Sequence, residues 1–206
     1  MRGLIGLVLI FTVYTIYQQL QIRRLQLHLS KQIETLGQIE ERTEKVYRLA
    51  VLDALTALYN CRAGERRLAE EISRSQRCAH PLTILLLDLN DLKAVNDTFG
   101  QPAGDQVIKR FAEHLQRSSR GSDVAVRLGG DEFMVILPEC KPEGVHLVLR
   151  RLEARKIELN GHSIDLRFSA GWTDYMPGES TETFLARADA VLYANKRACK
   201  EQIAAK

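Results

Sequence analysis

The stretch Arg127-Leu128-Gly129-Gly130-Asp131-Glu132-Phe133 lies between two apolar runs, residues 124–128 and 133–137, and it decides the fold. Valine and isoleucine in these runs favour β-strands, and Gly129-Gly130 supplies the positive φ angles of a tight two-residue turn. The stretch therefore predicts a β-hairpin with two carboxylates, Asp131 and Glu132, at its tip. A glycine pair alone is a weak signal, and a solvated acidic hairpin is its common alternative.

A second apolar strand, expected over residues 82–87, ends at Asp88. If this strand lies beside the hairpin, Asp88 comes close to Asp131 and Glu132. Carboxylates so crowded repel one another, and a divalent cation with oxygen ligands removes that repulsion. A pair of Mg²⁺ ions bound to a nucleoside triphosphate is the natural candidate.

Residues 127–133 read RLGGDEF, and from about residue 52 to residue 200 the chain resembles the GGDEF diguanylate cyclases. Four separate pieces of the family's motif set occur in the family's order. The resemblance implies an α+β fold, an α/β sandwich similar to the nucleotidyl cyclases. This fold is an elaborated ferredoxin-like βαββαβ unit with a mostly antiparallel central sheet, here preceded by a long N-terminal helix.

The resemblance implies that a dimer with one GTP per subunit condenses two GTP into cyclic di-GMP and releases two pyrophosphates. Two Mg²⁺ ions per active site are expected, with Mn²⁺ as a possible substitute. Their ligands would be Asp88, the backbone carbonyl of Leu89, Asp131 and Glu132. Either Asp131 or Glu132 would help to remove the hydroxyl proton, and the sequence leaves this choice open.

The family's substrate-binding positions fall on residues with suitable chemistry. A carboxylate accepts from the N1–H and N2–H₂ donors of guanine, and an asparagine side chain both donates and accepts, so GTP is preferred over ATP. The resemblance assigns Asn96 and Asp105 to the guanine edge and Leu55 to the wall of the base pocket. It assigns phosphate contacts to Lys93, Lys196 and Lys200, and nucleotide binding to Gln101.

Arg120 and Asp123 precede the first strand of the hairpin. An Arg-x-x-Asp pair on its own is a common surface pair of little energetic value. Its distance before Gly129 resembles the family's allosteric site, where both side chains would clamp a guanine of the inhibiting product, cyclic di-GMP.

Five positions depart from the family's pattern. Ala57 replaces a glycine in the segment 53–60, Cys61 replaces the first of two arginines, Asn90 replaces a frequent aspartate, Gln101 replaces a histidine, and Leu92 lies where an aromatic residue commonly lines the base pocket. The departures at Gln101 and Leu92 from the family's histidine and aromatic residue are expected to weaken the affinity for the nucleotide. The intact motif at residues 129–133 still favours a working enzyme.

Residues 1–22 are mostly apolar and uncharged apart from Arg2, and we expect them to form a membrane anchor. A cleaved signal peptide is the main alternative, but no small-x-small cleavage site follows. The heavier basic flank, Arg23-Arg24, predicts an inner (cytoplasmic) membrane protein with its catalytic domain in the cytoplasm.

Residues 23–51 are expected to form a coiled-coil stalk that pairs two chains, and residues 52–206 the catalytic domain. Two series of positions recur every seven residues and fit the seam of a two-stranded coil. They are Ile22, Leu29, Leu36, Thr43 and Ala50, and Leu25, Gln32, Ile39 and Val46. A single amphipathic helix that packs on its own domain is the alternative.

The composition narrows the possible partners and reaction types but does not point to a function by itself. The net charge of +3 has both signs interspersed and argues neither for nor against nucleic acid, which is not an expected partner. The four cysteines lack metal-ligand or disulfide-framework spacing, and the histidines do not cluster, so protein nucleophilic catalysis is not expected. A receptor for GTP or cyclic di-GMP and an interaction scaffold remain as rival functions.

The remaining pattern predicts further helices and a second hairpin. Helices are expected over residues 62–77, 92–99, 107–115, 142–155 and 183–198. The second hairpin is expected to run from 156–159 through Asn160-Gly161 into 162–171.

Overall fold

The computed structural model describes residues 2–152, 156–159 and 162–204, with side chains placed for 11–12, 14–26, 28–152 and 164–198. The chain divides into two compact units, Met1–Arg48 and Leu49–Lys206. The first unit is one helix, and the second contains all the strands. Each unit is described separately below.

Helix α1 runs over Arg2–Val51 without a break, as the long apolar-periodic segment predicts. In the part of the chain that the structure describes, no helix is long and apolar enough to cross a membrane. The prediction of an anchor over residues 1–22 is therefore not supported. Within its described part, Thr12, Thr15 and the neighbouring glutamines dilute the apolar residues, and the side chains of residues 1–10 lie outside the described residues.

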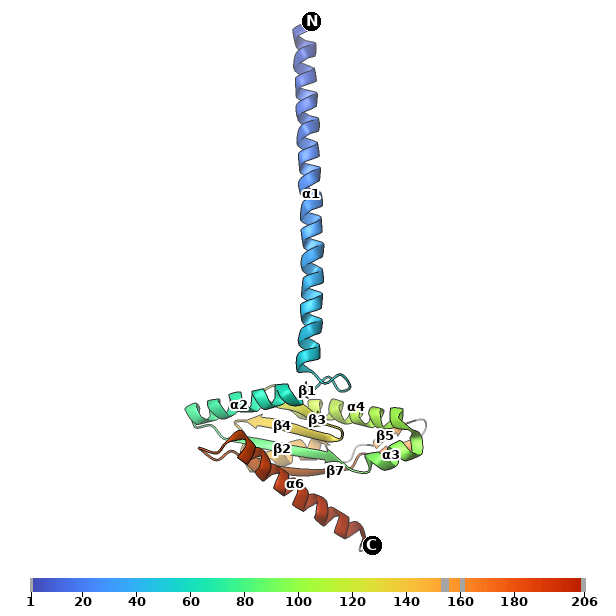
Figure 1. Ribbon diagram of the computed structural model, residues 1–206, viewed down its shortest axis with the longest axis vertical. Helices are drawn as coiled ribbons and strands as arrows, with labels where there is room; N and C mark the ends of the chain where they lie inside the picture. Colours follow the sequence, from blue (N-terminus) through green and yellow to red (C-terminus); the bar gives the residue numbers. More distant parts are fainter. Residues whose placement is uncertain (1, 153–155, 160–161, 205–206) are drawn as a thin grey trace. The chain divides into compact units, whose positions relative to one another are not determined.

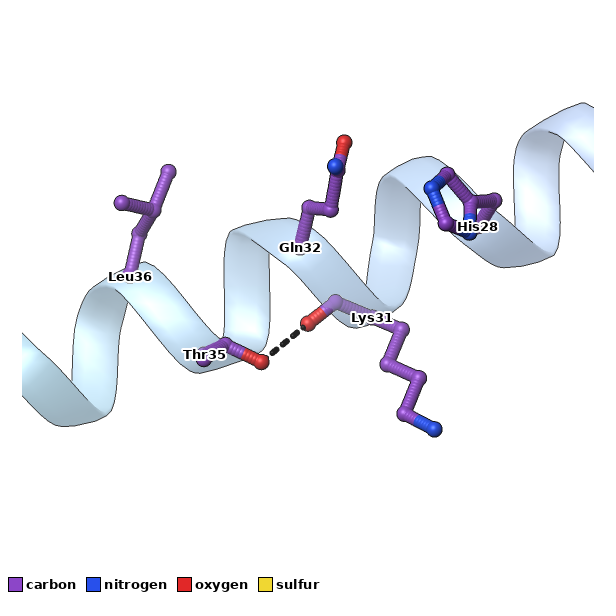
Figure 2. A pocket seen from close by; sticks show the side chains of 5 residues that line it. All are labelled: His28, Lys31, Gln32, Thr35 and Leu36. Carbon is purple, nitrogen blue, oxygen red and sulfur yellow. Dashed lines mark hydrogen bonds between the residues drawn. The ribbon is translucent and has the colours of Figure 1, made fainter.

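The expected seam of α1 is exposed within this single chain. Leu25, Leu29, Leu36 and Ile39 are each about half exposed or more. Figure 2 shows that Gln32 and Leu36 project to the same side of the helix, while the Thr35 hydroxyl donates to the Lys31 carbonyl oxygen at 2.8 Å. All five residues drawn come from one helix, so the hollow between them is a gap in a helix surface and not an enclosed ligand site.

The second unit is built on a five-stranded sheet in the order β1-β3-β4-β2-β7 (Figure 1). Only the short β1 is parallel to its neighbour, and the other pairs are antiparallel. The order β3-β4-β2-β7 is that of an antiparallel ferredoxin-like unit, so the predicted fold class is confirmed. The bounds are β1 Tyr59–Asn60, β2 Leu82–Leu89, β3 Val124–Gly129, β4 Glu132–Pro138 and β7 Phe168–Asp174.

Helices cover both faces of this sheet. Their bounds are α2 Cys61–Cys78, α3 Leu92–Phe99, α4 Gln101–Ser118, the 3₁₀ turn η1 Pro142–Gly144, α5 Val145–Leu152 and α6 Thr181–Ala204. On β2, Ile84 and Leu86 pack in one apolar cluster with α2 and α6, whereas Leu85 and Leu87 pack in a second with α4 and α5. β2 is buried along its whole length, as expected for an interior strand that is covered by helices on both faces.

The second hairpin forms as predicted at its start but not at its end. β5 Lys156–Leu159 pairs with β6 His162–Asp165 in a separate two-stranded sheet, and residues 160–161 between them lie outside the described residues. The expected single strand 162–171 is two strands, because β7 leaves the hairpin and pairs with β2 in the main sheet. The two strands are separated by Leu166-Arg167, which belong to neither, and the Arg167 carbonyl oxygen accepts from the backbone amide of Asn90 at 2.9 Å.

Candidate active site

Sheet register brings the acidic residues of two strands to one end of the domain. Asp88 lies directly opposite Glu132 on β4 and opposite Ser169 on β7. The Leu89 amide donates to the Asp131 carbonyl oxygen at 3.0 Å. Directly opposed residues of an antiparallel pair point to the same face, so Asp88 and Glu132 share the face covered by α2 and α6.

The hairpin turn differs by one residue from its prediction. Gly129 still pairs with Glu132, so the two turn residues are Gly130 and Asp131 rather than Gly129-Gly130. Both glycines have positive φ, 156° and 53°, as expected, and a register shift separates Arg127 from Gly129. This shift, typical of a β-bulge, lets the strand reach the turn with Asp131 half-buried and Glu132 exposed.

The Asp88 carboxylate is buried, with 6% of its side chain exposed, and Lys196 on α6 is its partner. The Lys196 Nζ lies 2.6 Å from Asp88 Oδ2. The other oxygen, Oδ1, is buried without any hydrogen-bond partner. A buried carboxylate oxygen without a donor is costly, so Asp88 is only half satisfied by the protein itself.

The three predicted metal-binding carboxylates do not form one cluster. Among the described residues, no group of three or more His, Cys, Asp or Glu side chains is close enough to hold a metal ion. The three side chains are therefore not gathered into one group in this structure, although the backbone register of Asp88, Asp131 and Glu132 is as expected. The physical reason is that the Lys196 ammonium lies on Asp88, while Glu132 extends into solvent. Their roles as metal ligands stay a prediction.

The position of Lys196 follows from one face of α6. Phe184, Ala188 and Leu192 are buried and recur every four residues, and Lys196 is the next residue in that series. At Gly171 on β7, an added Cβ would lie 2.2 Å from the Leu192 amide nitrogen. This close approach, which only glycine permits, brings the helix down onto the sheet one turn before Lys196.

The two residues assigned to the guanine edge lie where α3 meets α4. The side chain of Asn96 lies against the backbone of Gly104, since an added Cβ there would be 1.9 Å from Asn96 Oδ1. That oxygen is buried and has no hydrogen-bond partner. Asp105, the residue after Gly104, is half-buried.

The other predicted substrate residues are less closely held. Lys93 and Gln101 are exposed on α3 and α4, and Leu55 packs partly buried against the α4/α5 cluster. Lys200 lies within α6, but its side chain lies outside the described residues. Of the two lysines assigned to α6, the described contacts therefore connect Lys196 alone with the acidic residues.

Arg127 connects the hairpin turn with the first turn of the domain. Its Nε and Nη2 donate to the Gly130 carbonyl oxygen at 3.2 and 2.8 Å, and its Nη1 lies 3.0 Å from Asp53 Oδ1. Asp53 Oδ1 also accepts from the amide and hydroxyl of Thr56, at 2.9 and 2.7 Å. Burial raises the pKa of Asp53, but these hydrogen bonds from Thr56 and Arg127 outweigh it, so the pKa lies below its ordinary value.

Arg120 and Asp123 share one tight turn. The Arg120 amide donates to Asp123 Oδ2 at 2.6 Å, and the Asp123 amide donates to the Arg120 carbonyl oxygen at 3.0 Å. Asp123 therefore fixes the backbone of the turn, while Arg120 is exposed.

The sequence analysis missed the contacts of three residues of this site: Gly104, Arg127 and Gly171. A signal existed for Gly171, because an isolated glycine within a strand pattern marks a close backbone approach. The contact partners of Gly104 and Arg127 are defined only by tertiary packing.

Comparison with known sequences identifies relatives over this unit. The family profile described as "Diguanylate cyclase, GGDEF domain" matches residues 50–202. The chain is 36% identical over 158 residues to diguanylate cyclase DgcP of Pseudomonas aeruginosa, covering 75% of this chain and 24% of the relative. It is 32% identical over 169 residues to the probable diguanylate cyclase DgcC of Escherichia coli, covering 80% and 46%. The chain thus spans less than half of the length of these curated relatives.

Solved structures show the same likeness. The coiled coil and GGDEF domain of DgcB from Caulobacter crescentus, in complex with c-di-GMP, aligns with a TM-score of 0.76 at 30% identity, covering 84% of this chain and 95% of that one. Diguanylate cyclase SiaD of Pseudomonas aeruginosa, in complex with its activator SiaC, aligns with a TM-score of 0.69 at 30% identity, covering 91% and 77%. The chain therefore belongs to the GGDEF-domain diguanylate cyclase family.

Proposed function

We propose that this chain is a diguanylate cyclase, which joins two GTP molecules into cyclic di-GMP and releases two pyrophosphates. The observation that carries the proposal is the end of β2, where the half-satisfied carboxylate of Asp88 lies opposite Glu132 and next to the backbone of Asp131. Membership of the family supports the reaction, and the relatives' names identify them as enzymes of this activity.

In the proposed reaction, the 3′-hydroxyl of one GTP attacks the α-phosphorus of the other. A phosphorus–oxygen bond forms while the bond to pyrophosphate breaks, and the same step in the opposite direction closes the ring. Asp131 or Glu132 accepts the hydroxyl proton. Because no protein nucleophile takes part, the chain contributes by positioning the two substrates and by neutralising charge.

The chain's own residues fit a divalent cation such as Mg²⁺. The buried oxygen of Asp88 without a partner is a hard oxygen donor. Leu89, Asp131 and Glu132 carry further oxygen donors at adjacent backbone positions, and the two carboxylates would turn towards a bound ion. Bound there, Mg²⁺ would neutralise the triphosphate and polarise the phosphoryl group under attack. We propose two such ions per active site, for which Mn²⁺ can substitute.

Substrate choice is proposed to depend on Asn96 and Asp105. The partnerless Asn96 oxygen lies beside the first turn of α4, next to Asp105, where a base with adjacent N–H donors would satisfy both residues. Lys93, Lys196 and Lys200 are proposed to contact the phosphates, and Leu55 and Gln101 to complete the nucleotide site. GTP is a cytoplasmic nucleotide, so the cytoplasm is the proposed place of action.

The enzyme is proposed to work as a homodimer, since one domain holds only half of the reacting pair. The exposed apolar side chains of α1 recur at the spacing of a two-stranded coil. A paired stalk would raise the effective concentration of one catalytic domain near the other. Arg120 and Asp123 are proposed to bind cyclic di-GMP as an inhibitor, with Arg120 free to turn towards a guanine.

The test is incubation of the purified chain with Mg²⁺ and GTP, followed by chromatography for cyclic dinucleotide and an assay for pyrophosphate. Each GTP consumed should give one pyrophosphate and half a cyclic dinucleotide, a ratio of two to one, and ATP should give neither product. Asp131→Ala should abolish both products. Formation of cyclic di-GMP by Asp131→Ala at the wild-type rate would contradict the assignment of this carboxylate.

Product inhibition needs a separate measurement. Arg120→Ala should retain the initial rate but lose inhibition by added cyclic di-GMP. A variant that still binds and is inhibited by the product as the wild type is would show that Arg120 has no such role.

A further inference from the structure

We infer that Lys196 is the resident counter-ion of Asp88 in the metal-free domain and must leave that carboxylate before a divalent cation can bind. The inference rests on the proposed function, because it assumes that Asp88 is a metal ligand. Its basis is the 2.6 Å contact between Lys196 Nζ and Asp88 Oδ2 at a carboxylate that is otherwise buried.

The ammonium group and a metal ion cannot occupy this place together. A Mg²⁺ ion binds oxygen at about 2.0–2.1 Å, and two cations that share one carboxylate in a poorly hydrated site repel each other strongly. Asp88 Oδ1 has no hydrogen-bond partner, but a metal ion bound to it would share one carboxylate with the Lys196 ammonium on Oδ2. Metal binding therefore has to displace Lys196 or overcome its charge at close range.

Lys196, and not Asp88, is the partner that can move. Asp88 belongs to an interior strand that is paired on one side with β4 and on the other with β7. The Lys196 side chain is 34% exposed and carries its charge on a flexible four-carbon stem. Its backbone is held, because the neighbouring Asn195 side chain donates to the Ala170 carbonyl oxygen at 2.8 Å.

This exchange makes metal binding and phosphate binding depend on each other. When the ammonium leaves Asp88, it remains tethered near the same end of the sheet, where the substrate's phosphates are proposed to lie. A nucleotide would therefore stabilise the displaced lysine and raise the affinity for the metal. Without nucleotide, the displaced ammonium has only solvent, and metal affinity is low. Lys196 thereby opposes the loading of metal without substrate.

The experiment measures Mn²⁺ binding to the full chain without nucleotide, from the free-ion signal in electron paramagnetic resonance. Lys196→Gln keeps a polar side chain but removes the charge, and it should bind Mn²⁺ at least tenfold more tightly than the wild type. Lys109→Gln is the matched control, because it removes a positive charge by the same substitution from an exposed position on α4, and no described contact joins Lys109 to Asp88. Its affinity should stay within twofold of the wild type.

A second readout separates displacement from a general loss of charge. The thermal midpoint of Lys196→Gln without metal should fall below that of the wild type, since Asp88 loses its counter-ion, and saturating Mn²⁺ should raise it more than it raises the wild type. Lys196→Arg should behave like the wild type in both measurements. If Lys196→Gln proves unfolded without metal, Lys196→Arg and Lys196→Met are compared in the same titration.

The outcomes distinguish this inference from the proposed function. Equal Mn²⁺ affinities for Lys196→Gln and Lys109→Gln would overturn the counter-ion role, provided that Asp88→Asn has lost Mn²⁺ binding. Wild-type Mn²⁺ binding by Asp88→Asn would instead contradict the metal assignment on which the proposed function rests.

Discussion

Replacing Ala57 with glycine should stabilise the catalytic unit. Ala57 has a φ of 57°, in the left-handed region, and its amide donates to the Asp53 carbonyl oxygen at 2.9 Å. A residue with a Cβ costs roughly 1–2 kcal/mol in this conformation. Glycine removes that cost, but it increases the entropy of the unfolded chain by an equivalent of about 0.4–1 kcal/mol. The expected net gain in the free energy of unfolding is about 0.5–1 kcal/mol.

Trp172 makes this prediction measurable in the catalytic unit alone. It is the single tryptophan of the chain, and it packs half-buried on β7 with its ring 5.4 Å from that of His146. Its fluorescence in a urea titration therefore reports unfolding of the sheet and not of α1. Protein concentration is held constant across variants, because a dimer's stability depends on it.

The matched control is Ala69→Gly, the same chemical change at an exposed position within α2. There glycine should lower the free energy of unfolding by about 0.5–1 kcal/mol, because the backbone is helical. Opposite signs for the two variants are the expected result. If Ala57→Gly destabilises the unit as Ala69→Gly does, the left-handed conformation at Ala57 is refuted.

Three further results are expected. Gly104→Ala should raise the KM for GTP about tenfold, because its Cβ would fall 1.9 Å from Asn96 Oδ1. The tenfold change corresponds to a loss of about 1.4 kcal/mol of binding free energy. Gly121→Ala is the control and should leave the KM unchanged, because no atom lies within 4 Å of the added Cβ. The pKa of Asp53 is lowered in the folded state, so its stabilising contribution is present above its unfolded pKa of about 3.9 and is lost as the pH falls through the folded value. Urea titrations should therefore show the wild type's advantage over Asp53→Asn shrinking below about pH 4, and a constant difference would contradict this. Gln32→Leu should lower the dissociation constant of the dimer in analytical ultracentrifugation, and an unchanged constant would exclude a seam position for Gln32.

The sheet could be predicted because its signals are local. The run before Asp88 is continuously apolar, as a buried strand requires, and it forms β2. The hairpin has apolar runs on both sides of a glycine pair, and these runs form β3 and β4. The departure of β7 from the second hairpin could not be predicted, since residues 162–171 carry a continuous strand pattern. Pairing of β7 with β2 depends on the whole sheet and not on local propensity.

The site was predictable in its backbone and less so in its side chains. The order of the motifs led to Asp88 opposite Glu132, which depends on strand register. The position of Lys196 on Asp88 depends on how closely α6 approaches Gly171, and that distance is set by tertiary packing. The sequence assigned Lys196 to phosphates alone and missed its carboxylate partner.

The contacts of Arg127 limit where the upstream segment of such a protein can be exchanged. A fragment that begins at Leu58 keeps the whole RLGGDEF motif but loses Asp53, the carboxylate that holds one end of the Arg127 guanidinium. The arginine that supports the Gly130 carbonyl would then have no anchor outside its own hairpin. A recombination point that preserves the catalytic turn therefore has to lie before Asp53. A sensory module joined after Asp53 would leave the sheet folded, but Arg127 would hold the Gly130 turn less firmly.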